Sequence, residues 1–73
     1  MIDILVEEVA KDRQQVSLRA LNVRFIFVRE NGFIRIVSKT KPEAQTHDPA
    51  ACWVPKNVFA AVCRKAGAIL NPR

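Results

Sequence analysis

The sequence predicts a small α+β protein with one domain over residues 1–73: an N-terminal helix, a β-hairpin over about 23–38, a loop, and a C-terminal helix over about 55–66. Three observations lead to this architecture. Apolar residues recur at helical spacing near the N-terminus, an Asn-Gly pair separates two β-rich runs, and a second helical stripe precedes Gly67.

The hairpin prediction rests on residues 23–38, where β-branched and aromatic residues flank Asn31-Gly32. A two-residue type I′ turn needs positive φ at both central positions, and Asn and Gly tolerate this conformation best. The turn sets a register in which Glu30 pairs with Phe33, and Phe27 with Ile36. Continued without interruption, the same register pairs Arg24 with Lys39.

Side chains alternate across a strand, so this register sorts the hairpin into two faces. The expected core face carries Val23, Phe25, Phe27, Ile34 and Ile36. The other face, called here the mixed hairpin face, combines apolar with charged side chains: Ile26, Val28, Phe33 and Val37 with Arg24, Glu30, Arg35 and Lys39.

Residues 2 to about 14 favour an amphipathic helix, because the apolar positions 2, 5, 6, 9 and 10 share one helical face. The run Leu5-Val6-Glu7-Glu8-Val9 fits a period of 3.6 and breaks a period of two. The competing interpretation is a pair of strands over 4–10 and 16–21, turned at 11–14. Residues 16–21 are compatible with a longer helix, a second short helix or a strand, and Asn22 marks a break.

The C-terminal helix is expected to begin near Pro55, which is well tolerated in a first helical turn. Trp53 and Val58 have the spacing of a hydrophobic staple, and Gly67 is expected to terminate the helix in a left-handed conformation. Residues 68–70 are then expected to be extended. The apolar stripe of the helix consists of Val58, Phe59, Val62, Cys63 and Ala66.

Residues 39–51 are polar and contain two prolines, which indicates a loop. Lys39 and Lys41 lie near the mixed hairpin face, so we expect the loop to contribute to binding there. Loops of this length in compact domains are commonly functional or disordered.

Length and charge limit the function classes. A chain of 73 residues lies near the lower size limit for folding without a disulfide or metal. The net charge of +5 favours acidic partners. No apolar run approaches the ~18–20 residues of a membrane span, and the acidic start Met-Ile-Asp is unlike a signal peptide. We therefore expect a cytoplasmic protein that does not bind membranes.

Few residues are suited to chemistry. Cys52 and Cys63 are too far apart in the chain for the close ligand pairs typical of zinc sites, and His47 and Asp48 are adjacent, which suits a turn better than a base and its orienting group. A nucleophilic cysteine with His47 and Asp48 would also lack a substrate pocket in so small a chain. We expect no enzyme activity, cofactor, metal or small-molecule substrate.

Two functional interpretations remain. In the first, the chain is an interaction or regulatory module that contacts a protein, or a second copy as a homodimer, through the mixed hairpin face, with Ile26, Val28 and Val37 as the apolar patch. In the alternative, the hairpin binds DNA or RNA: phosphates contact the cations and Phe33 stacks on a base. The cations of this alternative are Arg24, Arg35, Lys39 and Lys41.

Overall fold

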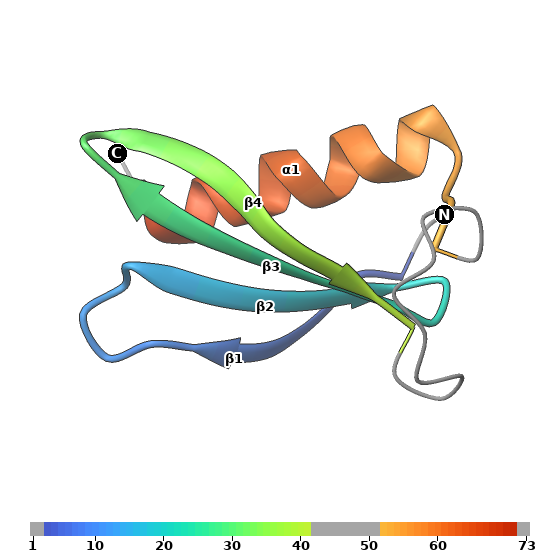
Figure 1. The fold of residues 1–73 in the computed structure, drawn as a ribbon, viewed down its shortest axis with the longest axis horizontal. Coiled ribbons are helices and arrows are strands. Elements are labelled where there is room, and N and C mark those ends of the chain that lie inside the picture. Colours follow the sequence, from blue (N-terminus) through green and yellow to red (C-terminus); the bar gives the residue numbers. More distant parts are fainter. Residues whose placement is uncertain (1–2, 42–51, 72–73) are drawn as a thin grey trace.

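The structure is a computed structural model that describes residues 3–41 and 52–71, and it consists of four antiparallel strands followed by one helix (Figure 1). The strands follow one another in the sheet in chain order, so each pairs with its neighbour in sequence. Their bounds, and that of the helix, are β1 Leu5–Val9, β2 Gln15–Ala20, β3 Val23–Glu30, β4 Phe33–Thr40 and α1 Lys56–Leu70.

The predicted N-terminal helix is wrong, because residues 5–9 and 15–20 form the strand pair β1 and β2. The reason lies at Glu7. The pairing of β1 with β2 shifts between Val6 and Glu8, so that Glu7 is an inserted residue. The two consecutive glutamates therefore interrupt the alternation of apolar and polar side chains along β1. A β-bulge of this kind breaks a period of two in the same way as a helical pattern does. In β2 the alternation is intact, with Val16, Leu18 and Ala20 buried.

The Asn-Gly turn is confirmed, with Asn31 at φ 54° and Gly32 at φ 82°. The predicted register is also confirmed from the Glu30–Phe33 pair to the Phe27–Ile36 pair. Beyond Ile36 it is wrong. A bulge at Val37 shifts the pairing by one residue, so that Phe25 lies opposite Lys39 and Arg24 lies opposite Thr40.

A second tight turn joins β2 to β3 and has no glycine. Ala20 pairs with Val23, and the two residues between them, Leu21 and Asn22, have φ values of 51° and 63°. Asn adopts this left-handed conformation readily, whereas Leu does so at a cost because its Cβ approaches the following carbonyl oxygen. Leu21 is also 57% exposed, so it gains little from burial.

The C-terminal helix is longer than predicted. Gly67 lies inside α1 rather than ending it, and residues 68–70 are helical. Their apolar side chains extend the i, i+4 pattern, so Leu70 is buried like Val62. The predicted staple is wrong as well: Trp53 is exposed and Val54 is buried instead. At the helix end, Arg29 donates a 2.8 Å hydrogen bond to the Leu70 carbonyl, where a cation also suits the helix dipole.

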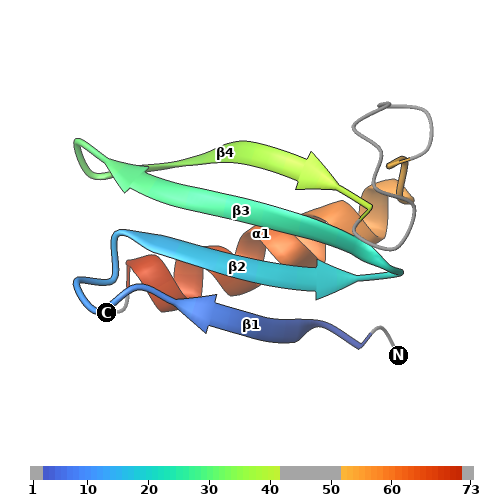
Figure 2. The same cartoon turned by 60° about the horizontal axis from the view of Figure 1, so that its bottom comes forward.

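All of α1 lies on one side of the sheet, and Figure 2 shows the strands in front of it. The helix packs mostly on β2, with smaller contacts to β3 and β4. The core forms between them, and Phe25 and Phe59 meet there with ring centroids 6.1 Å apart. The core face predicted for the hairpin is confirmed, since Val23, Phe25 and Phe27 are buried and the isoleucines of β4 pack against them. The buried residues are Val16, Leu18, Ala20, Val23, Phe25, Phe27, Cys52, Val54, Val58, Val62, Ala66 and Leu70.

In the part of the chain that the structure describes, the single helix is neither long nor apolar enough to cross a membrane. Most of the predicted loop, residues 42–51, lies outside the described residues.

Replacing Gly67 by Ala should stabilise the protein by about 0.5–1 kcal/mol, because glycine in a helix interior loses more backbone entropy than alanine. The new Cβ would lie 3.6 Å from Ile34 Cδ1, an ordinary contact distance. Urea denaturation followed by circular dichroism measures the change. A clear loss of stability would mean that Gly67 has the left-handed conformation of a helix terminator after all.

Leu21→Asn should also stabilise the fold, by about 0.5–1 kcal/mol, because Asn tolerates the positive φ of this turn. The same denaturation experiment applies, with Leu5→Asn as a control that removes an exposed leucine of β1 without changing a turn. An equal effect of both substitutions would show that exposure, and not the turn, determines the result.

Candidate functional site

The candidate site is the face of the sheet opposite α1, called here the open sheet face. The strand register and the alternation of side chains define its members. They are Leu5, Glu7, Glu8, Gln15, Ser17, Arg19, Arg24, Ile26, Val28, Glu30, Phe33, Arg35, Ser38 and Thr40. Among the described residues, no helix or strand packs on this face.

The middle of the open sheet face is aliphatic. Ile26 and Val28 belong to β3, an inner strand, and both are half-buried by their neighbours. Ile26 lies between Ser17 and Ser38 on the adjacent strands, and Val28 lies opposite Arg35 on β4. The face is therefore lowest in polarity at its centre, where two branched side chains remain in contact with water.

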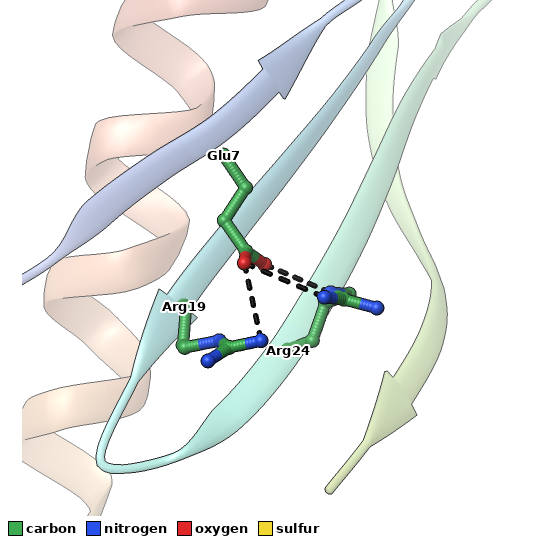
Figure 3. Close-up of polar contacts among 3 residues, drawn as sticks. All are labelled: Glu7, Arg19 and Arg24. Carbon is green, nitrogen blue, oxygen red and sulfur yellow. Dashed lines mark hydrogen bonds and ion pairs between the residues drawn. The ribbon is translucent and has the colours of Figure 1, made fainter. Parts of the chain in front are cut away.

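A three-residue ion cluster borders this centre (Figure 3). Arg24 donates from Nε to Glu7 Oε1 at 2.8 Å, and Arg19 Nη2 lies 3.2 Å from Glu7 Oε2. The two arginines are opposite each other on β2 and β3, where like charges repel. Glu7 reaches both from β1, and its carboxylate compensates this repulsion.

The bulge in β1 lies within this cluster. Glu7 is the residue between the pairs Val6–Leu18 and Glu8–Ser17, and its carboxylate contacts both arginines on the open side. Because of the inserted residue, Glu8 pairs with Ser17 and lies on the open side as well. The hydrogen bond from Arg24 is the main cause that lowers the pKa of Glu7 below its usual value, and the charges of Arg19 and Arg24 act in the same direction. Glu7 in turn raises the pKa of Arg24.

A second ion pair lies near the hairpin tip. Arg35 Nη2 is 3.0 Å from Glu30 Oε2, and both side chains are about 60% exposed, which makes the pair weak. Phe33 follows the turn and is 77% exposed. An exposed aromatic ring therefore lies beside a loosely held pair of opposite charges.

The open sheet face carries no net charge. Three arginines (Arg19, Arg24, Arg35) balance three glutamates (Glu7, Glu8, Glu30). The other described residues carry eight basic side chains against two acidic ones. The excess positive charge of the described residues therefore lies on the helix side, at the sheet edges and in the turn between β1 and β2: Lys11, Arg13, Arg29, Lys39, Lys41, Lys56, Arg64 and Lys65 against Asp3 and Asp12.

Five of the eight residues predicted to bind a partner share this face: Arg24, Ile26, Val28, Phe33 and Arg35. The other three do not. The bulge turns Lys39 to the side of the core residue Phe25, Val37 is the inserted residue itself, and Lys41 follows the end of β4.

Glu7 and Arg19 were not predicted as site residues. The apolar spacing favoured a helix for the segment that contains Glu7. The alternative strand pair contained the signal. Placed beside the hairpin, a strand over residues 16–21 brings Arg19 next to Arg24.

Within residues 3–41 and 52–71, no group of three or more His, Cys, Asp or Glu side chains is arranged to hold a metal ion. His47 and Asp48 lie outside the described residues. Cys52 is buried in the core, and burial raises the pKa of the Cys63 thiol. Cys52 therefore lacks the exposure, and Cys63 the lowered pKa, that are typical of a nucleophile.

Comparisons of the chain with protein-family models, curated proteins and solved structures find no significant match.

The Glu7 cluster should make stability depend on pH. Because folding lowers the pKa of Glu7, its contribution is present above the unfolded-state pKa and is lost as the pH falls through the folded-state value. Glu7→Gln should therefore lower the free energy of unfolding near pH 6. The difference in this free energy between the variant and wild type should shrink toward about pH 3. Denaturant melts across this range measure it.

Glu30→Gln serves as the control, since it removes the carboxylate of the more exposed ion pair. It should alter the acid-dependent loss of stability less than Glu7→Gln does. A constant difference between wild type and Glu7→Gln at every pH would contradict a role for the ionised carboxylate.

Proposed function

We propose that this chain is a small non-catalytic interaction module that associates with a second copy of itself through the open sheet face. The observation that supports this most directly is the make-up of that face: an aliphatic centre inside a border of equal numbers of positive and negative side chains.

The apolar centre supplies the driving force. Ile26 and Val28 lie on an inner strand of a sheet that, among the described elements, is covered by a helix on one side only. Contact with another surface would remove both side chains from water, and this burial is favourable in proportion to the apolar area. Stable interfaces commonly place such a centre within a polar rim.

The balanced charges favour a second copy as the partner. In a two-fold symmetric contact, a surface meets itself. A surface with a large net charge repels its own copy, whereas the open sheet face can place the glutamates of one copy near the arginines of the other. The excess of positive charge lies elsewhere on the protein, where it does not oppose the contact.

Phosphate binding by this face has less support. Glu7 holds Arg24 and lies within ion-pair distance of Arg19, and Glu30 pairs with Arg35. A phosphate group would have to displace these carboxylates and would also meet their negative charge. Lys39, which the nucleic-acid interpretation requires beside Arg24, is on the side of the helix.

A second candidate function is nucleic-acid binding by a different surface. Residues 33–41 and 52–71 contain no acidic residue, and five of their six lysines and arginines, all except Arg35, lie outside the open sheet face. Exposed Lys56, Arg64 and Lys65 on α1 belong to this set. Such a surface attracts polyanions by releasing their counterions, without requiring the open sheet face.

A cytoplasmic location is part of the proposal. Cys52 and Cys63 are not joined in a disulfide, as is usual in a reducing compartment.

Val28→Lys should abolish self-association while leaving the monomer folded, because a charged side chain would be placed at the centre of the contact. Sedimentation velocity over a range of protein concentrations measures the mass, and circular dichroism checks the fold. Ala60→Lys adds the same charge on the exposed side of α1 and should associate like wild type.

A wild-type protein that remains monomeric at high concentration, or a Val28→Lys variant that associates normally, would refute the proposed contact. Mixed-sequence oligonucleotide is added in a parallel run at low and high salt. A complex that forms at low salt with wild type and Val28→Lys alike would support nucleic-acid binding by the helix side.

A further inference from the structure

The outer edge of β4 is a second candidate binding surface, separate from the open sheet face. β4 is the last strand of the sheet, eight residues long, and pairs only with β3 among the described strands. Every second residue of an edge strand directs its N–H and C=O groups away from the sheet, where another extended chain can pair with them.

A hollow of about 340 Å³ adjoins this edge, between β4 and α1. It exists because the helix packs mostly on β2 and covers β4 incompletely. Ile36 and Phe59 are only partly buried there, and Val37 is 44% exposed. The residues that line the hollow are Ile36, Val37, Ser38, Lys39 and Phe59.

We propose that the β4 edge and this hollow bind an extended acidic peptide segment, which adds a fifth strand to the sheet. Side chains of an added strand alternate between the two faces of the sheet. Those on the helix side would therefore lie in the hollow against Phe59, while the peptide backbone pairs with β4. Strand addition of this kind takes its affinity from backbone hydrogen bonds and its specificity from the pockets for alternate side chains.

The charges of β4 select the occupant. Lys39 and Lys41 lie toward the end of this edge, and residues 33–41 contain no Asp or Glu. Arg35 of the same strand pairs with Glu30 on the open sheet face. Lys39 itself lines the hollow. Two copies paired edge to edge would bring these cations together, which is unfavourable between adjacent strands. An acidic segment meets the opposite charge, so the edge disfavours a second copy and favours a peptide with alternating acidic and apolar residues.

The bulge at Val37 determines on which side of β4 the charge of Lys39 lies. Without it, Lys39 would lie on the open sheet face with Arg24, as the uninterrupted register requires. With it, Lys39 lies on the helix side together with the partly buried apolar residues of the hollow. A positive charge and an apolar hollow are thus placed on the same side of one edge strand.

The test uses a fluorescently labelled eight-residue peptide of alternating Glu and Val, titrated with the full-length protein and followed by fluorescence anisotropy. Lys39→Glu should weaken binding about tenfold, a loss of about 1.4 kcal/mol. Lys11→Glu is the matched control. It changes the net charge equally at an exposed position between β1 and β2, and should weaken binding less than about twofold at physiological salt, where distant charges are screened.

Two further peptides of the same sequence test backbone pairing. Each is N-methylated at every second residue, one along one edge of the extended peptide and the other along the opposite edge. One of the two methylation patterns should abolish binding, because it removes the N–H groups that face β4. Amide shifts in the ¹H–¹⁵N spectrum should then concentrate in β4 and near Phe59.

Equal weakening by Lys39→Glu and Lys11→Glu would overturn the inference, since it would show attraction by net charge alone. Undiminished binding of both methylated peptides would also overturn it. Amide shifts centred on Ile26 and Val28 would move the peptide to the open sheet face, and shifts confined to α1 would indicate a polyanion surface. Either result would refute the β4 site without deciding the self-association of the open sheet face, which the Val28→Lys experiment tests separately.

Discussion

The rest of the structure depends on the packing of one amphipathic helix on one face of a four-stranded sheet. The buried stripe of α1, from Val58 to Leu70, meets the inward side chains of β2 and β3, and together they form the core. The chain has no second described helix for the other face. That face must therefore be compatible with water or with a partner, and its combination of ion pairs with an aliphatic centre satisfies both. The same offset of the helix toward β2 leaves the hollow beside β4.

Two bulges distribute the charges over these surfaces. The one in β1 places Glu8, in addition to Glu7, on the open sheet face, so that the glutamates of this face equal its arginines in number. The one in β4 moves Lys39 to the helix side, which concentrates positive charge near the hollow. One inserted residue in each edge strand thus separates a neutral, self-complementary face from a cationic edge. Bulges are known to re-aim side chains in this way.

The sequence was sufficient to predict the hairpin, its Asn-Gly turn and the alternation of its core side, because local turn chemistry and a period of two agree there. It was misleading at the two inserted residues. The bulge at Glu7 produced a spacing that resembles a helix, and the bulge at Val37 moved Lys39 to the other side of the sheet from the one predicted. The Leu21-Asn22 turn carries no glycine, so the β2–β3 connection had no clear signal. Gly67 resembled a helix end, although the apolar pattern continues to Leu70. Accordingly, the residues of the candidate site on β3 and at the hairpin tip were predictable, and Glu7 and Arg19 were not.

Self-association through the open sheet face requires Ile26 and Val28 to be exposed in the single chain and covered in its complex. Methyl relaxation by a soluble, neutral paramagnetic agent tests it most directly, in dilute and in concentrated solution, with the buried Val62 methyls as the internal reference. We expect strong relaxation of the Ile26 and Val28 methyls in the dilute monomer, and protection of the same methyls at concentrations where the mass doubles. Equal relaxation in both states, or protection already present in the monomer, would contradict it.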